Sequence, residues 1–147
     1  MILLVTFFVF GCSNKQLSND LNVAHSSCYN YSYGERDFEK DYDKAFKWCT
    51  IAAEFNEPSS VTLLAELYLM GNGTSKDLAK AHELYLKAAK QDHLHAQLMV
   101  FLISNLYMYE ATTHEEKVEG VMYLEKARDR GYRKAIDVYN QAYGKEI

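Results

Sequence analysis

The side chains best suited to metal or acid–base chemistry lie in the middle and last thirds of the sequence. Histidine nitrogens are common zinc ligands, and His82, His93 and His95 occur close together in the chain. His93 and His95 are two positions apart, however, so on a helix they point to different faces. Because no cluster of cysteines or carboxylates completes a ligand set, we predict surface histidines and no metal site.

Carboxylates of the kind used in general acid–base catalysis cluster at Glu115, Glu116 and Glu119. The spacing Thr113-x-x-Glu116 is more typical of a capping box, in which two side chains satisfy free N–H groups at the start of a helix. The chain has no Ser-x-x-Lys, Gly-x-Ser-x-Gly or phosphate-cradling glycine motif. We therefore predict no catalytic residue and no cofactor.

The elements that would position any site are clearest in residues 63–91. Apolar side chains at Leu64, Leu67 and Tyr68 recur at helical spacing. The Gly-Asn-Gly sequence at 71–73 then predicts a helix end, because glycine tolerates the positive φ of a C-terminal cap. A second apolar stripe predicts another helix after the turn. The stripe consists of Ala81, Leu84, Tyr85, Ala88 and Ala89.

Copies of this helix–turn–helix unit recur along the chain. Asp41 precedes Asp77 by 36 residues, and Ala88 precedes Ala127 by 39 residues. On the first-helix side, one phase is shared by Ser60, Ala96 and Ala135. Internal similarity at a period of this length indicates a stacked helical solenoid, in which each unit buries its apolar stripe against its neighbours.

The middle copy, residues 64–89, resembles the Sel-1-like repeat, a relative of the tetratricopeptide repeat. The matching residues are Leu64, Tyr68, Gly71, Gly73, Asp77, Lys80, Ala81, Tyr85, Lys87, Ala88 and Ala89. The chain departs from the family pattern at Ala65, Thr74 and Leu84, where the family has glycine, valine and tryptophan. The resemblance covers roughly residues 24–143, with the outer copies keeping the phase of the middle one.

This resemblance implies an all-α fold, a curved, right-handed α-solenoid of about three to four antiparallel helix pairs. We expect one repeat domain over residues 23–147. Its repeats are expected at about 24–59, 60–95 and 96–134, followed by a capping helix at 135–144. The family also implies adaptor work, meaning that the chain binds a protein partner and catalyses no reaction.

The first residues of the chain are apolar and too few to span a bilayer as a helix, and they are typical of a signal peptide. The sequence Val-Phe-Gly-Cys at 9–12 resembles a bacterial lipobox. That resemblance implies a signal peptide over residues 1–11, lipidation of Cys12 and a polar tether over residues 12–22. A plain secretion signal, or a short apolar helix packed on the repeats, remains the alternative.

The residue after the lipobox cysteine is Ser13, which by the same resemblance favours the outer membrane. We therefore expect a bacterial outer membrane lipoprotein that faces the periplasm. If Cys12 is not lipidated, the expectation is a secreted or periplasmic protein. The N-terminal lipid is the only membrane contact expected.

Two further cysteines, Cys28 and Cys49, fall at the repeat positions of Leu64 and Tyr85, on facing sides of a first and a second helix. If the chain is secreted and Cys12 carries lipid, a disulfide between them is the favoured hypothesis, because the periplasm is oxidising. In a reducing compartment the alternative is a pair of buried free thiols.

The charge and the aromatic content of the chain limit the classes of partner that it can bind. The formal net charge is −4 and the isoelectric point is near 5.7, with lysines and arginines scattered among acids. The absence of a basic stripe argues against nucleic acid. Twelve tyrosines are an unusual number, and tyrosine is enriched at protein interfaces. The partner-binding candidates are Tyr31, Asn105, Tyr107, Tyr109 and Tyr139. The alternative is that these side chains only cover the core or cap the ends of the array.

The favoured function is a non-enzymatic protein-binding scaffold. A small lipoprotein with few such repeats also resembles immunity proteins that neutralise secreted antibacterial toxins, notably lipase effectors of type VI secretion. Some cysteine-containing members of the family are described as penicillin-binding proteins or weak β-lactamases, which gives the enzymatic alternative. A structural role in the cell envelope is the third hypothesis.

Overall fold

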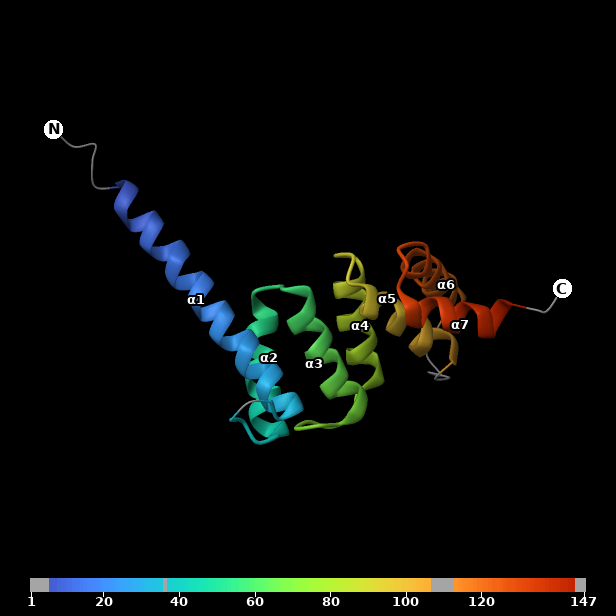
Figure 1. Ribbon diagram of the computed structural model, residues 1–147, viewed down its shortest axis with the longest axis horizontal. Coiled ribbons are helices and arrows are strands. Elements are labelled where there is room, and N and C mark those ends of the chain that lie inside the picture. Colours follow the sequence, from blue (N-terminus) through green and yellow to red (C-terminus); the bar gives the residue numbers. More distant parts are fainter. Residues whose placement is uncertain (1–5, 36, 107–112, 145–147) are drawn as a thin grey trace.

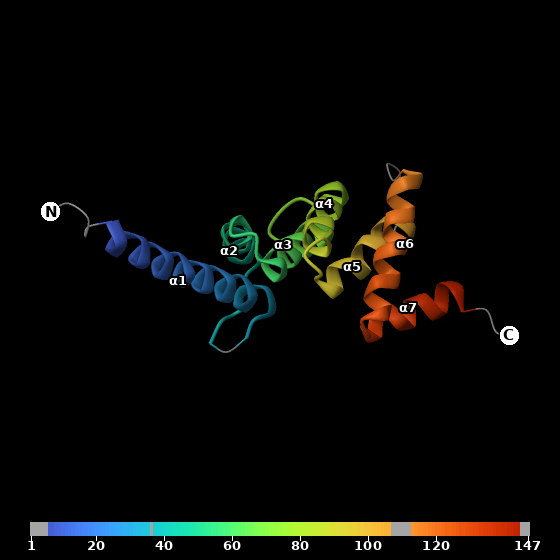
Figure 2. The ribbon, with the colours of Figure 1, turned by 90° about the horizontal axis from the view of Figure 1, so that it is seen from above.

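The computed structural model describes residues 6–35, 37–106 and 113–144, with side chains described from residue 19 onward. This part of the chain is helical throughout and contains no strand. The helices stand side by side in chain order in Figure 1, and Figure 2 shows the same row from above. They are α1 (Thr6–Tyr33), α2 (Tyr42–Glu54), α3 (Pro58–Met70), α4 (Leu78–Ala89), α5 (Leu94–Phe101), the π-helical segment η1 (Leu102–Leu106), α6 (His114–Asp129) and α7 (Arg133–Tyr143). The predicted all-α solenoid is confirmed.

Each odd-numbered helix packs on the helix that follows it, so α1, α3 and α5 are the first helices of three units and α2, α4 and α6 are the second helices. Helix α7 packs on α6 and opens a further unit as a first helix. The shared phase predicted for the first helices is confirmed, because Ser60, Ala96 and Ala135 are each fully buried. Small side chains at these positions let neighbouring helices approach closely.

The backbone repeats the period of the sequence at the helix ends. Asp41 and Asp77 are both N-caps, and their carboxylates accept the backbone N–H of the third residue on at 3.0 and 2.9 Å. The second helices end near residues with positive φ, namely Asn56, Asp92 and Gly131. Glycine, asparagine and aspartate adopt this left-handed conformation at lower cost than other residues.

The turn between α3 and α4 requires both of its glycines. Gly71 caps α3 with a φ of 74°, as the sequence predicted. Gly73 has a φ of 67°, and a Cβ there would collide with the backbone carbonyl of Tyr42 at the start of α2. The turn therefore packs against the preceding unit and fixes how α3 and α4 sit beside α2.

The third unit is irregular. Helix α5 continues into the π-helical η1. Gly120 of α6 lets α6 approach η1 closely, because a Cβ at this position would collide with Ser104 and Asn105. Helix α6 opens with the predicted capping box, in which Thr113 and Glu116 each accept the other's backbone N–H. The last helix, α7, begins two residues before the capping helix expected at 135–144.

The N-terminal helix is longer than the sequence indicated. The repeat domain is predicted from residue 23 onward, but its first helix, α1, begins at Thr6 and includes the residues expected to form a tether. The start of α1 projects away from the other helices in Figure 1. No helix in the described part of the chain has the length and apolar character needed to cross a bilayer. The assignment of residues 1–11 and 12–22 to a signal peptide and a tether stays a prediction, and the Cys12 side chain lies outside the described ones.

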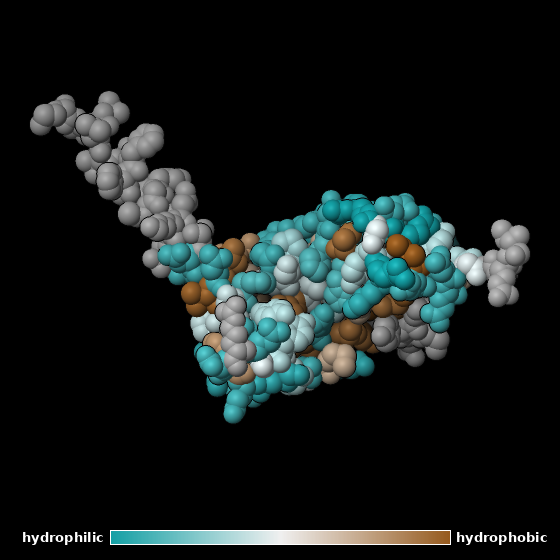
Figure 3. Space-filling model, in the orientation of Figure 1, coloured by the Kyte–Doolittle hydropathy of each residue, from teal (hydrophilic) through white to brown (hydrophobic). Residues whose placement is uncertain are grey.

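The surface of the repeat body is mostly hydrophilic. On the face shown in Figure 3, apolar side chains form small separate patches among polar and charged ones. This agrees with the scattered charge of the sequence, and it directs the search for a site to places where particular side chains converge.

Candidate functional site

A hydrogen-bonded row of side chains crosses the first helices. The Tyr33 hydroxyl on α1 donates to Glu66 Oε2 on α3 at 3.0 Å. Glu66 Oε1 lies 3.1 Å from His95 Nε2 on α5. His95 Nδ1 in turn lies 3.3 Å from the hydroxyl of Tyr132, the N-cap residue of α7. We call Tyr33, Glu66, His95 and Tyr132 the first-helix row.

The contacts within the row are consistent with one set of protonation states. In the tautomer with its proton on Nε2, His95 donates to the Glu66 carboxylate and accepts from the Tyr132 hydroxyl at Nδ1. Burial, followed by the charge of Glu66 and the hydrogen bond to it, raises the pKa of Tyr33 well above its usual value. Burial and the Glu66 charge also raise the pKa of Tyr132. Both tyrosines therefore remain neutral donors at physiological pH.

A second set of contacts lies beside the row. His25 Nδ1 on α1 lies 2.8 Å from Ser60 Oγ on α3 and 3.5 Å from Glu57 Oε2. Glu57 is the N-cap of α3 and accepts the backbone N–H of Ser60 at 2.7 Å. His93 is the N-cap of α5, and burial followed by the nearby His95 lowers its pKa. The first helices are thus joined by polar side chains that also cap them.

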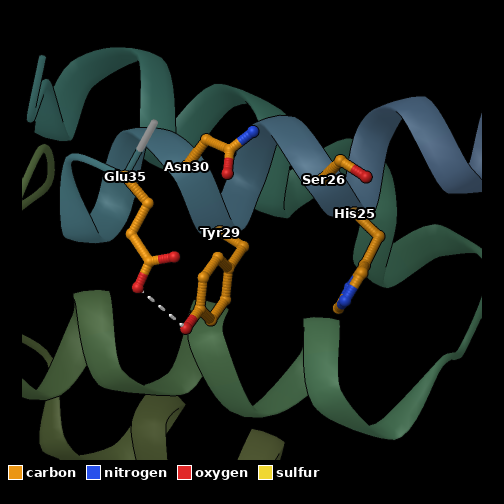
Figure 4. A pocket seen from close by; sticks show the side chains of 5 residues that line it. All are labelled: His25, Ser26, Tyr29, Asn30 and Glu35. Atoms are coloured by element: carbon orange, nitrogen blue, oxygen red, sulfur yellow. Dashed lines mark hydrogen bonds between the residues drawn. The ribbon is translucent and has the colours of Figure 1, made fainter. Parts of the chain in front are cut away.

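Two adjoining hollows open on this face. One has a volume of about 300 Å³, and the row residues Tyr33, Glu66 and His95 line it together with His25, Tyr29 and His93. The other, about 290 Å³, shares His25 and Tyr29 and extends to Glu35. Figure 4 shows Tyr29 and His25 projecting from α1 towards α3, with the Tyr29 hydroxyl donating to Glu35 at 3.3 Å. Neither hollow has a lysine or arginine among its described lining residues.

The residues that the sequence proposed for partner binding are spread along the chain. Tyr31 is half-buried, packs edge-on against Phe38 and lies under the ammonium of Lys44. Asn105 Nδ2 donates to Lys117 O at 3.1 Å. Tyr139 lies under the Arg128 guanidinium at 4.0 Å.

The structure does not bring these candidates together, since Tyr31 is on α1, Asn105 follows α5 and Tyr139 is on α7. Tyr107 and Tyr109 lie outside the described residues. A partner-binding role for all five stays a prediction.

The residues that sequence reasoning missed are Glu66, His95 and Tyr132. Tyr29 and Tyr33 are also absent from the candidates that the sequence proposed. The signal that was present is positional: His95 directly precedes the buried Ala96 on a first helix, so it lies at the edge of the core. A search for polar residues at the core edge of every first helix would have found the row.

The expectation of surface histidines is wrong for His82, which is only 7% exposed on α4. Burial lowers the pKa of His82, although Glu116 and Glu119 on the neighbouring helix oppose the shift. No group of three metal-ligating side chains occurs among the described residues.

The two cysteines of the first unit meet between α1 and α2. Their Sγ atoms are 2.06 Å apart and both side chains are fully buried. The structure therefore joins Cys28 to Cys49, across the pair of helices that the repeat register indicated. Formation of this bond in the cell depends on the compartment and stays a prediction.

Comparison with known proteins identifies the family of the repeats. The model of the Sel1 repeat matches residues 21–54, 58–93 and 115–132, which together are more than half of the chain. Among curated proteins, chitin synthase regulatory factor 3 of Schizosaccharomyces pombe is 31% identical over 98 residues, covering 66% of this chain and 10% of that protein.

Solved structures share the fold. A Sel1 repeat protein from Oxalobacter formigenes superposes with a TM-score of 0.69 at 24% identity, covering 84% of this chain and 49% of its own. The protein c5321, a protective antigen of uropathogenic Escherichia coli with an SLR fold, superposes with a TM-score of 0.76 at 18% identity, covering 92% of this chain and 28% of its own. The chain thus spans half or less of each of these relatives.

Proposed function

This chain belongs to the Sel1 repeat family, and on that premise we propose that it is a non-enzymatic scaffold whose first-helix face holds a protein partner. The family supplies the coarse function, since Sel1 repeats form helical scaffolds that typically mediate protein–protein interaction. The structure suggests where the partner binds, because polar and aromatic side chains from successive first helices converge on the hollows beside the first-helix row.

The observation that carries the proposal is the exposure of the tyrosines over these hollows. Tyr29 and Tyr33 are 40% and 44% exposed, and their rings pack on each other with centroids 4.8 Å apart. The Tyr33 hydroxyl is fixed by Glu66, so its ring is ordered before a partner arrives. An ordered, half-exposed aromatic side chain is typical of an interface hot spot, because binding it costs little further entropy.

The finer proposal concerns location and partner. The lipobox-like sequence ending at Cys12 supports a lipoprotein of the bacterial outer membrane, held by its N-terminal lipid and facing the periplasm. The partner that we propose is a secreted toxin, such as a lipase effector of type VI secretion, which would make the chain an immunity protein. No observation favours a β-lactamase or penicillin-binding activity or a purely structural envelope role, so neither is proposed.

Affinity capture with matched variants tests the scaffold proposal. The bait is the full chain, compared with a Tyr33→Ala/Glu66→Ala double variant and with Glu54→Ala, which removes an exposed acid from the second helix α2. We expect one protein to be recovered by the wild type and by Glu54→Ala and lost by the double variant. A partner recovered equally by all three proteins would refute the proposal that the first-helix face is the binding surface.

The immunity proposal has its own test. The chain is expressed together with a toxin encoded beside its gene and directed to the periplasm. We expect survival with the wild type and loss of protection with the double variant. Cells killed equally with and without the wild-type chain would contradict the immunity role while leaving the scaffold proposal standing.

The lipid anchor is tested by Cys12→Ser in the same cells. The wild type should fractionate with the outer membrane and the variant should appear in the soluble periplasmic fraction. Identical fractionation of the two proteins would contradict lipidation at Cys12.

A further inference from the structure

The tyrosines of this chain differ in what covers their rings. Tyr42 lies under Lys40 at 5.5 Å, Tyr31 under Lys44 at 5.3 Å and Tyr139 under Arg128 at 4.0 Å. Each of these rings therefore already holds a cation of its own chain. Among the described residues, no lysine or arginine lies over Tyr29 or Tyr33, although both rings line the same hollow and pack against each other at a tilt.

Acidic groups surround these two uncovered rings. Glu66 lies at the Tyr33 hydroxyl and Glu35 at the Tyr29 hydroxyl. The Glu66 carboxylate accepts one bond on each oxygen, which leaves further acceptor capacity on both. Its side chain is 31% exposed, so this capacity can be reached from solvent.

One lysine near Tyr33 and Glu66 does not lie over the two uncovered rings. Lys40 shares a separate hollow with Tyr33 and Glu66, but its ammonium lies over the Tyr42 ring. The other titratable groups that line the hollows are His25, His93 and His95, and His95 Nε2 lies 3.1 Å from Glu66 Oε1. Among the described residues, the site thus combines two ring faces and two carboxylates with no lysine or arginine over them.

We propose that the Tyr29–Tyr33 ring pair and the Glu66 carboxylate form a receptor for an arginine side chain presented by the partner protein. A guanidinium stacks on aromatic faces and at the same time donates in its plane to a carboxylate. The chain shows the stacking half of this arrangement within itself, where the Arg128 guanidinium lies over Tyr139. A lysine ammonium satisfies the charge and lacks the planar stacking, so it fits less well.

This inference rests on the proposed scaffold function and specifies its partner chemistry. The test uses the full chain carrying isotope-labelled tyrosine rings, titrated in an NMR experiment with the peptide acetyl-Gly-Gly-Arg-Gly-Gly-amide. The control peptide carries citrulline, which keeps the shape of arginine and has no charge. We expect the arginine peptide to move the Tyr29 and Tyr33 ring signals in a saturable manner and the citrulline peptide to leave them in place.

Variants separate recognition from folding. Glu66→Gln keeps the shape and an acceptor for Tyr33, and it should weaken arginine-peptide binding about fivefold, the size expected for losing a partly exposed charge pair. Glu54→Gln removes the same charge from α2 and should leave binding unchanged. Tyr29→Leu should also weaken binding while the unfolding temperature reports that the variant is folded.

Three results would overturn the inference: equal shifts with the citrulline peptide, unchanged binding by Glu66→Gln, or a lysine peptide that binds as tightly as the arginine peptide. Different results would refute the arginine site and the scaffold function. If the Tyr33→Ala/Glu66→Ala variant loses the captured partner while the arginine peptide moves neither ring, the first-helix face binds protein by other chemistry. If the peptide binds and no protein is captured by this face, the arginine site stands and the scaffold proposal falls.

Discussion

Tyr33 on α1 donates a hydrogen bond to Glu66 on α3, and this bond joins two first helices 33 residues apart in sequence. Glu66 also contacts α5, where its carboxylate is hydrogen-bonded to His95. Side chains at one face of the array therefore connect neighbouring units and help to fix their relative positions. The same side chains line the hollows proposed to receive a partner, so positioning of the units and binding depend on one set of residues.

Removing only the Tyr33 hydroxyl should have a small effect on stability. We expect Tyr33→Phe to lower the free energy of unfolding by roughly 0.5–1 kcal/mol, the usual net worth of one partly exposed hydrogen bond. Urea denaturation measures the change, with Tyr29→Phe as a control whose bond to Glu35 is longer, at 3.3 Å, and does not join two helices of the array. A loss several times larger would show that the row stabilises the fold far more than its single bonds suggest.

Breaking the link between Cys28 and Cys49 should destabilise the chain. Their separation of 21 residues corresponds to a stabilisation of about 3 kcal/mol in the chain-entropy model. We expect the Cys28→Ala/Cys49→Ala variant to unfold at lower urea concentration than the oxidised wild type, and reductant to lower the midpoint of the wild type alone. If reductant has no effect on the wild type, the two sulfurs are not bonded in the protein as purified.

Stability should fall as the solution becomes acidic. Burial lowers the pKa of both His82 and His93 below the ordinary 6.5, so the unfolded chain binds protons more readily than the folded one. Their contribution to stability is complete above pH 6.5 and is lost as pH falls towards the lowered pKa values. Urea midpoints measured from pH 8 to pH 5 should decline, and His82→Gln should flatten the decline. An unchanged slope in that variant would contradict the assignment to His82.

The turn between α3 and α4 should tolerate no side chain at Gly73. We expect Gly73→Ala to cost more than about 2 kcal/mol, because it combines a positive φ with a collision against the Tyr42 carbonyl. Gly131→Ala is the matched control, since its φ is also positive and nothing lies within 4 Å of the added carbon, and it should cost about 1 kcal/mol. Equal melting temperatures for the two variants would show that the turn can move away from α2.

The features that sequence analysis predicted are those fixed within one unit. Gly71 closes α3, the capping box of Thr113 and Glu116 opens α6, and the shared phase of Ser60 and Ala96 is the buried one. Each depends on helical period or on local backbone conformation, which a single sequence reveals.

What sequence analysis missed depends on how units stack. Glu66 and His95 meet only because successive units stack and bring α3 near α5. The apolar period within each helix gives no information about that contact. The early start of α1 at Thr6 was missed because the polar residues after Cys12 carry no apolar stripe. Tyr31 and Tyr139 were chosen by residue type, whereas the structure shows cations of the chain itself over both rings.

The most direct test of the account is the affinity of the captured partner for the purified chain, measured by calorimetry at neutral pH. The account predicts that Tyr33→Ala/Glu66→Ala weakens binding at least about tenfold, as truncating an interface hot spot does, while Glu54→Ala binds as the wild type does. Equal affinity of the double variant and the wild type, with both proteins folded, would contradict the claim that the first-helix face is the binding surface.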